Sequence, residues 1–108
     1  MINKFKIYAV CGSGVATSTL LANRLKTGLQ KEGILSFVII ECSIRDLERL
    51  VQNSHPDFII YTTPLDVLDL KDIKIFNGLP ILMNKDTASL YKEIASYLRT
   101  RGSRFILK

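Results

Sequence analysis

The alternation of short apolar runs with longer segments of helical period constrains the fold most. Apolar, β-prone runs occupy residues 5–10, 35–41 and 57–62, and helical period appears between and after them. Strands that alternate with helices predict a parallel sheet, because each parallel connection has to cross the sheet before the next strand begins. Right-handed crossovers then place helices on both faces of that sheet.

The first helical segment is predicted to begin at Ser18. Leu21, Leu25 and Leu29 recur every four residues, while the charged side chains of the segment fall elsewhere. This spacing gives a helix one apolar stripe. Gly33 stands where a glycine commonly ends a helix.

Two further helices are predicted from their starts. Ser43 is a suitable N-cap with Asp46 in the first turn, and Asp86 or Thr87 caps the last helix. The inward-facing side chains of these two helices are Ile44, Leu47, Leu50 and Val51, and then Leu90, Ile94 and Leu98. Gly102 is predicted to lie beyond the end of the last helix.

Residues 72–76 or residues 79–83 could each form the fourth strand, and the first assignment is preferred, with residues 79–83 as a tight extended continuation. The 108 residues are enough for one core. We therefore expect a single domain, residues 1–108, of the α/β class. It is a three-layer sandwich whose four-stranded parallel sheet carries helices on both faces, like half of a Rossmann or flavodoxin-like fold.

Composition excludes two other classes of protein. The formal charge is +5, but no basic strand interleaved with aromatic residues is present, so no nucleic-acid role is predicted. A basic cluster of Arg99, Arg101, Arg104 and Lys108 is interpreted as a solvated C-terminal tail. No apolar run approaches the roughly 20 residues of a membrane span, so the chain is expected to have no membrane segment of its own and to be cytoplasmic.

The segment from Cys11 to Ser18 joins the first strand to the first helix and carries the predicted chemistry. Ligands of open parallel sheets bind beyond the carboxyl ends of the strands. Backbone N–H groups at the two glycines and at the helix start favour an anion, and hydroxyls add donors. The predicted phosphate-binding positions are Gly12, Ser13, Gly14, Val15, Ala16, Thr17 and Ser18.

Cys11 stands at the rim of this pocket, where a helix N-terminus lowers the pKa of a thiol. A thiolate is a nucleophile, so the sequence predicts a phosphocysteine at Cys11.

Two other interpretations of the loop stay open. A dinucleotide site would use Gly12 and Gly14, with Glu41 as the ribose-binding acid, but the third small residue of that fingerprint is Thr17. A cysteine phosphatase would need an arginine at the end of the loop. No arginine precedes Arg24, and without such a clamp hydrolysis should be slow.

Several other side chains invite a role. Thr62, Thr63 and Asp66 follow the third strand at the same edge, and either extend the site or a partner surface or merely end the strand. His55 precedes that strand, so it is expected at the opposite edge as an exposed turn residue. Cys42 is interpreted as a small buried apolar residue, with a regulatory disulfide to Cys11 as the alternative.

Three stretches of this sequence closely resemble one family. Residues 11–26, 57–66 and, more loosely, 77–82 are similar to IIB components of the galactitol type in the phosphoenolpyruvate-dependent sugar phosphotransferase system (PTS). The similarity covers most of the chain. It departs at residues 83–86, where the family has a glycine-rich segment.

The resemblance implies a function as well as a fold. In such proteins a loop cysteine, matched here by Cys11, accepts a phosphoryl group from a phosphohistidine of a IIA partner. It then passes the group to a sugar or sugar alcohol held by a membrane-embedded IIC partner. The matching phosphate site is residues 12–18. The chain would thus be a protein-phosphocysteine–sugar phosphotransferase component at the inner face of the membrane, with no metal and no cofactor. The ascorbate and lactose/cellobiose types share this architecture.

Overall fold

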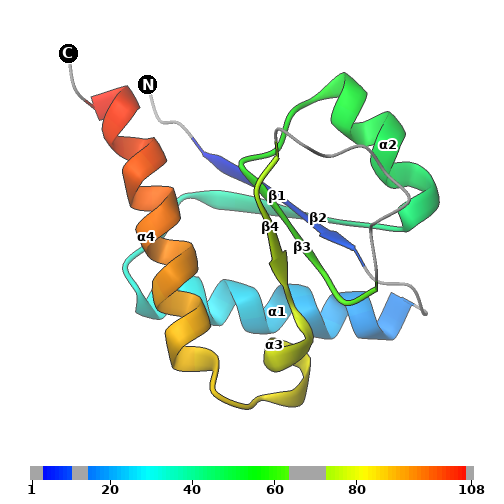
Figure 1. Cartoon of the computed structure of the whole chain (residues 1–108), viewed down its shortest axis with the longest axis horizontal. Coiled ribbons are helices and arrows are strands. Elements are labelled where there is room, and N and C mark those ends of the chain that lie inside the picture. Colours follow the sequence, from blue (N-terminus) through cyan, green and yellow to red (C-terminus); the bar gives the residue numbers. More distant parts are fainter. Residues whose placement is uncertain (1–3, 11–14, 64–72, 107–108) are drawn as a thin grey trace.

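The computed structural model describes residues 4–10, 15–63 and 73–106, and it describes the side chains of these residues except at 15–18 and 101–106. Within these described residues, four strands and four helices follow one another (Figure 1). In order they are β1 (Phe5–Val10), α1 (Val15–Lys31), β2 (Phe37–Cys42), α2 (Ile44–Asn53), β3 (Phe58–Tyr61), β4 (Ile75–Asn77), α3 (Leu79–Met83) and α4 (Thr87–Ile106).

The four strands form one parallel sheet in the order β2-β1-β3-β4. The register aligns the last residues of the strands in a single row of Cys42, Val10, Tyr61 and Asn77. We call this row the carboxyl edge. The four-stranded parallel sheet predicted from the sequence is therefore confirmed.

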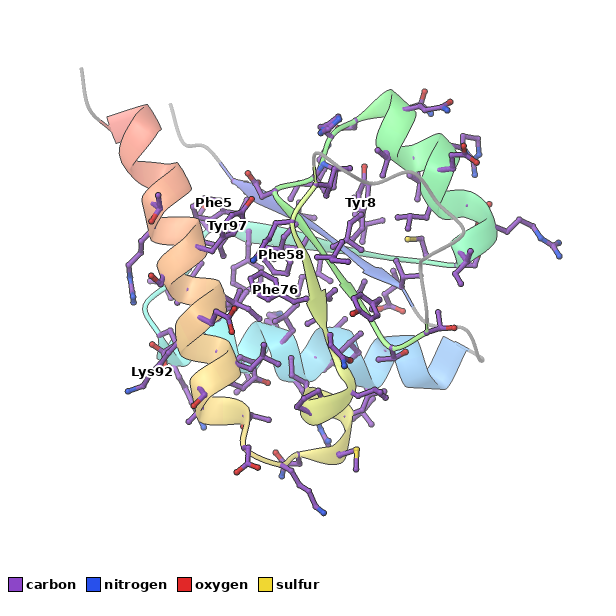
Figure 2. The ribbon with its side chains drawn as sticks, in the orientation of Figure 1. Phe5, Tyr8, Phe58, Phe76, Lys92 and Tyr97 are labelled. Carbon is purple, nitrogen blue, oxygen red and sulfur yellow. The ribbon has the colours of Figure 1, made fainter. Side chains whose placement is uncertain are left out.

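Helices cover both faces of the sheet, so the predicted three-layer sandwich is also confirmed. Alternate residues of β1 face opposite layers: Ile7 and Ala9 join the core with α1, α3 and α4, whereas Tyr8 and Val10 pack with α2. In Figure 2, Tyr8 lies on the α2 side and Phe58 on the other. On that second side the rings of Phe58 and Phe76 meet edge to face, with centroids 5.2 Å apart.

Most helix boundaries follow the predicted signals. The Ser43 hydroxyl oxygen accepts the N–H of Asp46 at 3.3 Å and caps α2. Gly33 has a φ of +89° just past α1, and α4 begins at Thr87. Helix α1 begins at Val15 rather than at the predicted Ser18. The prediction began too late because the first turn of the helix carries no part of the apolar stripe from which the helix was recognised.

Residues 79–83 are a helix, so the predicted extended continuation of the fourth strand is wrong. Strand β4 ends at Asn77, whose side-chain oxygen accepts the N–H of Leu79 at 3.0 Å. Pro80 occupies the first turn of α3, where its missing N–H costs nothing. The apolar run at residues 79–83 therefore forms one short helix, in which Ile81 is buried.

Helix α4 continues through Gly102 to Ile106, so the predicted end before Gly102 is wrong. One glycine inside a helix costs only about 1 kcal/mol, and the buried face of Ile94 and Leu98 anchors the preceding turns. Arg99, Arg101 and Arg104 therefore belong to a helix and not to a tail, while Lys108 lies outside the described residues. In the part of the chain that the structure describes, no helix is long and apolar enough to span a bilayer.

The segment between α3 and α4 contains two residues other than glycine with positive φ. Asn84 and Asp86 have φ values of +56° and +51°. These values lie in the left-handed region, which glycine enters freely and which asparagine and aspartate tolerate best among the other residues. The chain therefore makes a left-handed turn here without glycine.

Candidate functional site at the carboxyl edge

The predicted nucleophile belongs to a loop that connects β1 to α1. Cys11, Gly12, Ser13 and Gly14 lie outside the described residues, but both ends of this loop, Val10 and Val15, are placed. We call residues 11–14 the Cys11 loop. The remaining predicted phosphate-binding positions, residues 15–18, form the first turn of α1. The first four N–H groups of an α-helix have no carbonyl partner within the helix and carry partial positive charge.

The Cys11 loop leaves the sheet at its topological switch point. From β1 the chain crosses one face through α1 to reach β2, and it returns across the other face through α2 to reach β3 (Figure 1). Beyond the carboxyl ends of β1 and β3 the two connections therefore diverge, and open α/β sheets bind their ligands in the crevice formed there.

Thr62 lies beside the start of this loop. Its backbone N–H donates to the carbonyl oxygen of Val10 at 3.0 Å, which extends the pairing of β1 with β3 beyond Tyr61. Thr62 and Thr63 are both half-buried at the carboxyl edge, as predicted from their place after the third strand. Asp66, the third residue of that prediction, lies outside the described residues.

Glu41 joins β2 to α1 on the other side of the loop. Its carboxylate accepts a hydrogen bond from the Thr19 hydroxyl at 3.2 Å. The acid that a dinucleotide site would use for ribose thus contacts the second turn of α1. The next residue, Cys42, pairs with Val10 in the sheet and is half-buried against the α2-side core, so it is less buried than predicted. Its alternative disulfide involves Cys11, which the structure does not describe.

The Arg24 side chain forms hydrogen bonds with α3. Its Nη1 donates to the carbonyl oxygens of Ile81 at 3.0 Å and Leu82 at 2.7 Å. These contacts satisfy carbonyls in the last turn of α3, where helices leave them without partners. Arg24, the first arginine after Cys11, therefore makes a structural contact with α3, a role that the sequence did not reveal.

His55 lies at the opposite end of the sheet, as predicted. It is exposed and precedes β3 by a short turn. In that turn the N–H of Asp57 donates to the carbonyl oxygen of Lys6, near the start of β1, at 2.7 Å. His55 thus stands at the amino end of strands whose carboxyl ends carry the Cys11 loop.

Two tyrosines have perturbed acidity for structural reasons. Burial raises the pKa of Tyr8, and an interaction with the side chain of Ser54 lowers it in part. The Tyr8 hydroxyl donates to the carbonyl oxygen of Ser54 at 2.6 Å, at the end of α2. Burial likewise raises the pKa of Tyr91, with a smaller opposing effect from the Arg24 charge.

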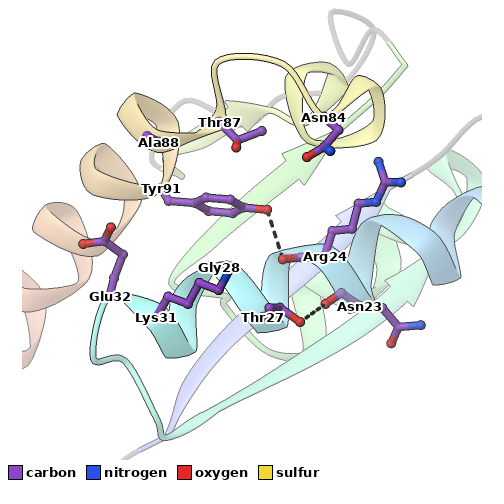
Figure 3. A pocket seen from close by; sticks show the side chains of 10 residues that line it. All are labelled: Asn23, Arg24, Thr27, Gly28, Lys31, Glu32, Asn84, Thr87, Ala88 and Tyr91. Carbon is purple, nitrogen blue, oxygen red and sulfur yellow. Dashed lines mark hydrogen bonds between the residues drawn. The ribbon is translucent and has the colours of Figure 1, made fainter.

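A groove of about 480 Å³ lies between α1 and the start of α4 (Figure 3). The Tyr91 ring lies within it, and the Tyr91 hydroxyl donates to the carbonyl oxygen of Arg24 at 3.0 Å. The groove is lined by Asn23, Arg24, Thr27, Gly28, Lys31, Glu32, Asn84, Thr87, Ala88 and Tyr91. It contains no cysteine or histidine, and on α1 it begins two turns after the first residue of the helix. Sequence reasoning did not predict it.

Comparison with known proteins decides the family. Residues 6–98 match the family model described as PTS system, Lactose/Cellobiose specific IIB subunit. The chain belongs to this family. The match confirms the predicted PTS IIB component but not its predicted galactitol type, and it gives the chain a phosphotransferase role with IIA and IIC partners.

Curated relatives of this PTS IIB chain carry a different sugar in their names. The galactitol-specific EIIB components of Escherichia coli (strain K12), Escherichia coli O157:H7 and Shigella flexneri are each 29% identical to it over 96 residues. The match covers 89% of this chain and 98% of each relative.

Proposed function

We propose that this PTS IIB chain is a phosphoryl carrier whose nucleophile is Cys11. It receives the group from a phosphohistidine of a IIA partner and delivers it to a sugar or sugar alcohol held by a IIC partner. The observation that carries the proposal is the course of the chain at the carboxyl edge. The Cys11 loop follows the end of a central strand and leads directly into the N-terminus of a long helix.

In the first step, the Cys11 thiolate attacks the phosphorus of the phosphohistidine. An S–P bond forms, the N–P bond breaks, and the imidazole nitrogen leaves with the electron pair and takes a proton from water. N–H groups of residues 12–18 would hold the phosphoryl oxygens, aided by the partial positive charge at the start of α1. Such positioning and charge stabilisation account for most of the catalysis of phosphoryl transfer.

In the second step, a hydroxyl of the sugar attacks the same phosphorus. An O–P bond forms, the S–P bond breaks, and the sulfur leaves as a thiolate, which a helix N-terminus stabilises. The hydroxyl proton passes to a base outside this chain. Neither step, as written, uses a metal or a cofactor.

We infer a galactitol-like polyol as the acceptor from the names of the curated relatives. A IIB chain that meets a membrane-embedded IIC partner works at the inner face of the membrane, which agrees with the absence of an apolar span in the described helices. Thr62 and Thr63 would then form part of the rim that faces the partners.

Replacing each cysteine separately tests the carrier role. Wild type, Cys11→Ser and Cys42→Ser are incubated with a phosphorylated galactitol-type IIA protein, and intact mass is measured under non-acidic conditions. Wild type and Cys42→Ser should each gain one phosphoryl group, and Cys11→Ser should gain none. Equal labelling of Cys11→Ser, or a label mapped to His55, would contradict the proposal.

The same preparations test the alternative chemistries. Turnover of p-nitrophenyl phosphate should be negligible, because Arg24 contacts α3 instead of a bound phosphoryl group. Titration with NAD or ATP should show no specific binding.

A further inference from the structure

The groove between α1 and the start of α4 has the size of a small-molecule site. Its volume of about 480 Å³ falls within the roughly 300–1,000 Å³ of typical ligand pockets. Its walls come from these two helices and from the turn before α4 (Figure 3). The phosphoryl transfer proposed above uses none of the residues that line it, so the groove is available for a separate role.

The Tyr91 ring forms a fixed, flat wall of this groove. A Cβ added to Gly28 would come within 2.3 Å of the ring, so the ring rests directly on the backbone of α1. The Tyr91 hydroxyl donates to the carbonyl oxygen of Arg24 at 3.0 Å, which fixes the far end of the ring. Tyr91 is only half-buried, so part of it stays open to a ligand. The face of an aromatic ring carries partial negative charge and attracts the C–H groups of a saturated ring.

Polar side chains with unused hydrogen-bonding groups surround the ring. In the part of the chain that the structure describes, the side chains of Asn23, Lys31, Asn84 and Thr87 make no hydrogen bond and no ion pair. All four line the groove and are exposed or half-buried. A ligand can therefore gain several hydrogen bonds here without breaking one inside the protein.

The charges along the groove suit a ligand with one anionic end. Arg24 uses Nη1 for the carbonyl oxygens of α3, which leaves its Nε–Nη2 edge as a pair of parallel donors. Asn84 follows Leu82, an acceptor of that Nη1, by two residues, so its amide lies at the same end of the groove (Figure 3). At the other end Lys31 is accompanied by Glu32, whose carboxylate repels a phosphate but accepts from hydroxyls.

We propose that this groove binds a phosphorylated monosaccharide, with its phosphate at Arg24 and Asn84 and its ring against Tyr91. Two parallel N–H groups of a guanidinium match the geometry of a phosphate. The sugar hydroxyls then reach Lys31 and Glu32. A nucleotide fits less well, because the groove offers one aromatic ring among polar side chains and no apolar slot for a base. The inference stands on these residues and does not depend on the nucleophile of the carrier.

Direct titration of the whole chain tests the ligand class. Glucose 6-phosphate and mannose 6-phosphate are the probes, and glucose, inorganic phosphate and adenosine monophosphate are the comparison ligands. Calorimetry should give a Kd below about 1 mM for at least one sugar phosphate. Glucose and inorganic phosphate should each bind at least about tenfold more weakly, because each makes only part of the contacts. Amide chemical shifts of nitrogen-15-labelled protein should change at residues 23–32 and 84–91.

Two matched pairs of variants test the assigned residues. Asn84→Gly removes the amide and keeps the left-handed backbone accessible, and Asp86→Gly makes the equivalent change at a similar φ outside the groove. Lys31→Gln and Lys26→Gln each remove one exposed charge from α1, but only Lys31 lines the groove. Asn84→Gly and Lys31→Gln should each weaken binding about fivefold, the equivalent of one hydrogen bond. Neither control should weaken it by more than about twofold.

Tyr91→Ala should abolish measurable binding, and thermal unfolding shows whether this variant is folded. If it is not, the two matched pairs decide.

Four results would overturn the assignment. The first is no binding of either sugar phosphate up to about 10 mM. The second is tighter binding of adenosine monophosphate, which would make the groove a nucleotide site. The third is equal affinity for inorganic phosphate, which would indicate an unspecific anion site. The fourth is a set of shift changes confined to residues 15–18 and 62–63, which would place the ligand at the carboxyl edge.

Discussion

The backbone N–H of Thr62 donates to the carbonyl oxygen of Val10 at 3.0 Å, at the last described residue before Cys11. The end of β3 is thereby fixed to the point where the chain enters the loop. Thr62 acts in this contact through its backbone, which separates the role of its position from that of its hydroxyl.

Thr62→Pro should lower the free energy of unfolding by about 1 kcal/mol, because it deletes one hydrogen bond. It should also slow phosphorylation of Cys11. Thr62→Val keeps the N–H and should leave both properties close to wild type, as should Thr63→Val. Urea unfolding and the rate of mass labelling measure the two effects. Equal damage from Thr62→Val would show that the hydroxyl, not the backbone, matters.

Gly78→Ala should destabilise the protein by about 1–3 kcal/mol through overpacking. An added Cβ would lie 3.0 Å from Ile60 Cγ1, 3.0 Å from Leu21 Cδ1 and 3.2 Å from the carbonyl oxygen of Tyr61. The N–H of Gly78 already donates to that carbonyl at 2.6 Å, so the backbone has little room to retreat.

Gly33→Asn is the control for this substitution. Gly33 has a φ of +89°, and the nearest atom to an added Cβ is Arg99 Nη2 at 3.9 Å. Asparagine tolerates a left-handed conformation, so this change should cost clearly less than Gly78→Ala in the same denaturation assay. A cost for Gly33→Asn that equals that of Gly78→Ala would refute the packing argument.

Gly28→Ala should have opposite effects in two backgrounds. In wild type an added Cβ would come within 2.3 Å of the Tyr91 ring, which would have to move and lose the hydrogen bond to Arg24. Stability should therefore fall. In a Tyr91→Ala background the same change should stabilise the helix by up to about 1 kcal/mol, because alanine is the better helix former. A destabilising effect of the same size in both backgrounds would contradict the contact.

Stability should decline in alkali because of Tyr8. Burial raises its pKa, so the folded state keeps the proton above the ordinary pKa of about 10 while the unfolded chain loses it. The contribution of Tyr8 to stability is therefore complete below the ordinary pKa, and it is lost as the pH rises through the pKa of Tyr8 in the folded state.

Tyr8→Phe checks this assignment by denaturant unfolding from neutral pH to above pH 10 or so. The variant should lose about 1 kcal/mol at neutral pH, because the bond to Ser54 is gone. It should also show a shallower alkaline decline. Tyr91→Phe in addition should reduce the decline further, because the pKa of Tyr91 is raised too. If the free energy of unfolding of the double variant declined with pH as steeply as that of wild type, neither tyrosine would be the cause of the alkaline decline.

The sequence predicted the layers of this fold because each long element carries a clear period. Leu21, Leu25 and Leu29 are fully buried, as their spacing required. Residues 79–83 were misassigned, since five apolar residues are too few to separate a buried strand from a helical turn. Gly102 was interpreted as the end of the last helix from its residue type alone. Helix α4 instead continues through Gly102, because the preceding turns are anchored by packing.

For the candidate site, the sequence predicted the location in the fold but not the contacts between side chains and backbone. The carboxyl edge could be located because parallel strands end together, and the row from Cys42 to Asn77 confirms that location. The contacts of Arg24 with α3 could not be foreseen, because they join residues nearly 60 positions apart. Such pairings depend on how the helices pack, which no local pattern encodes.

The two outer layers of the sandwich are attached with unequal strength. Helix α2 has ten residues and buries only Leu47 completely, whereas α1 places three leucines in the opposite core. Local opening starts where the least apolar surface must be exposed. The molecule can therefore loosen on the α2 side, transiently wetting Tyr8 and Ile59, while the layer that carries the start of α1 stays closed. Solvent should accordingly exchange the amide hydrogens of α2 before those of the middle turns of α1.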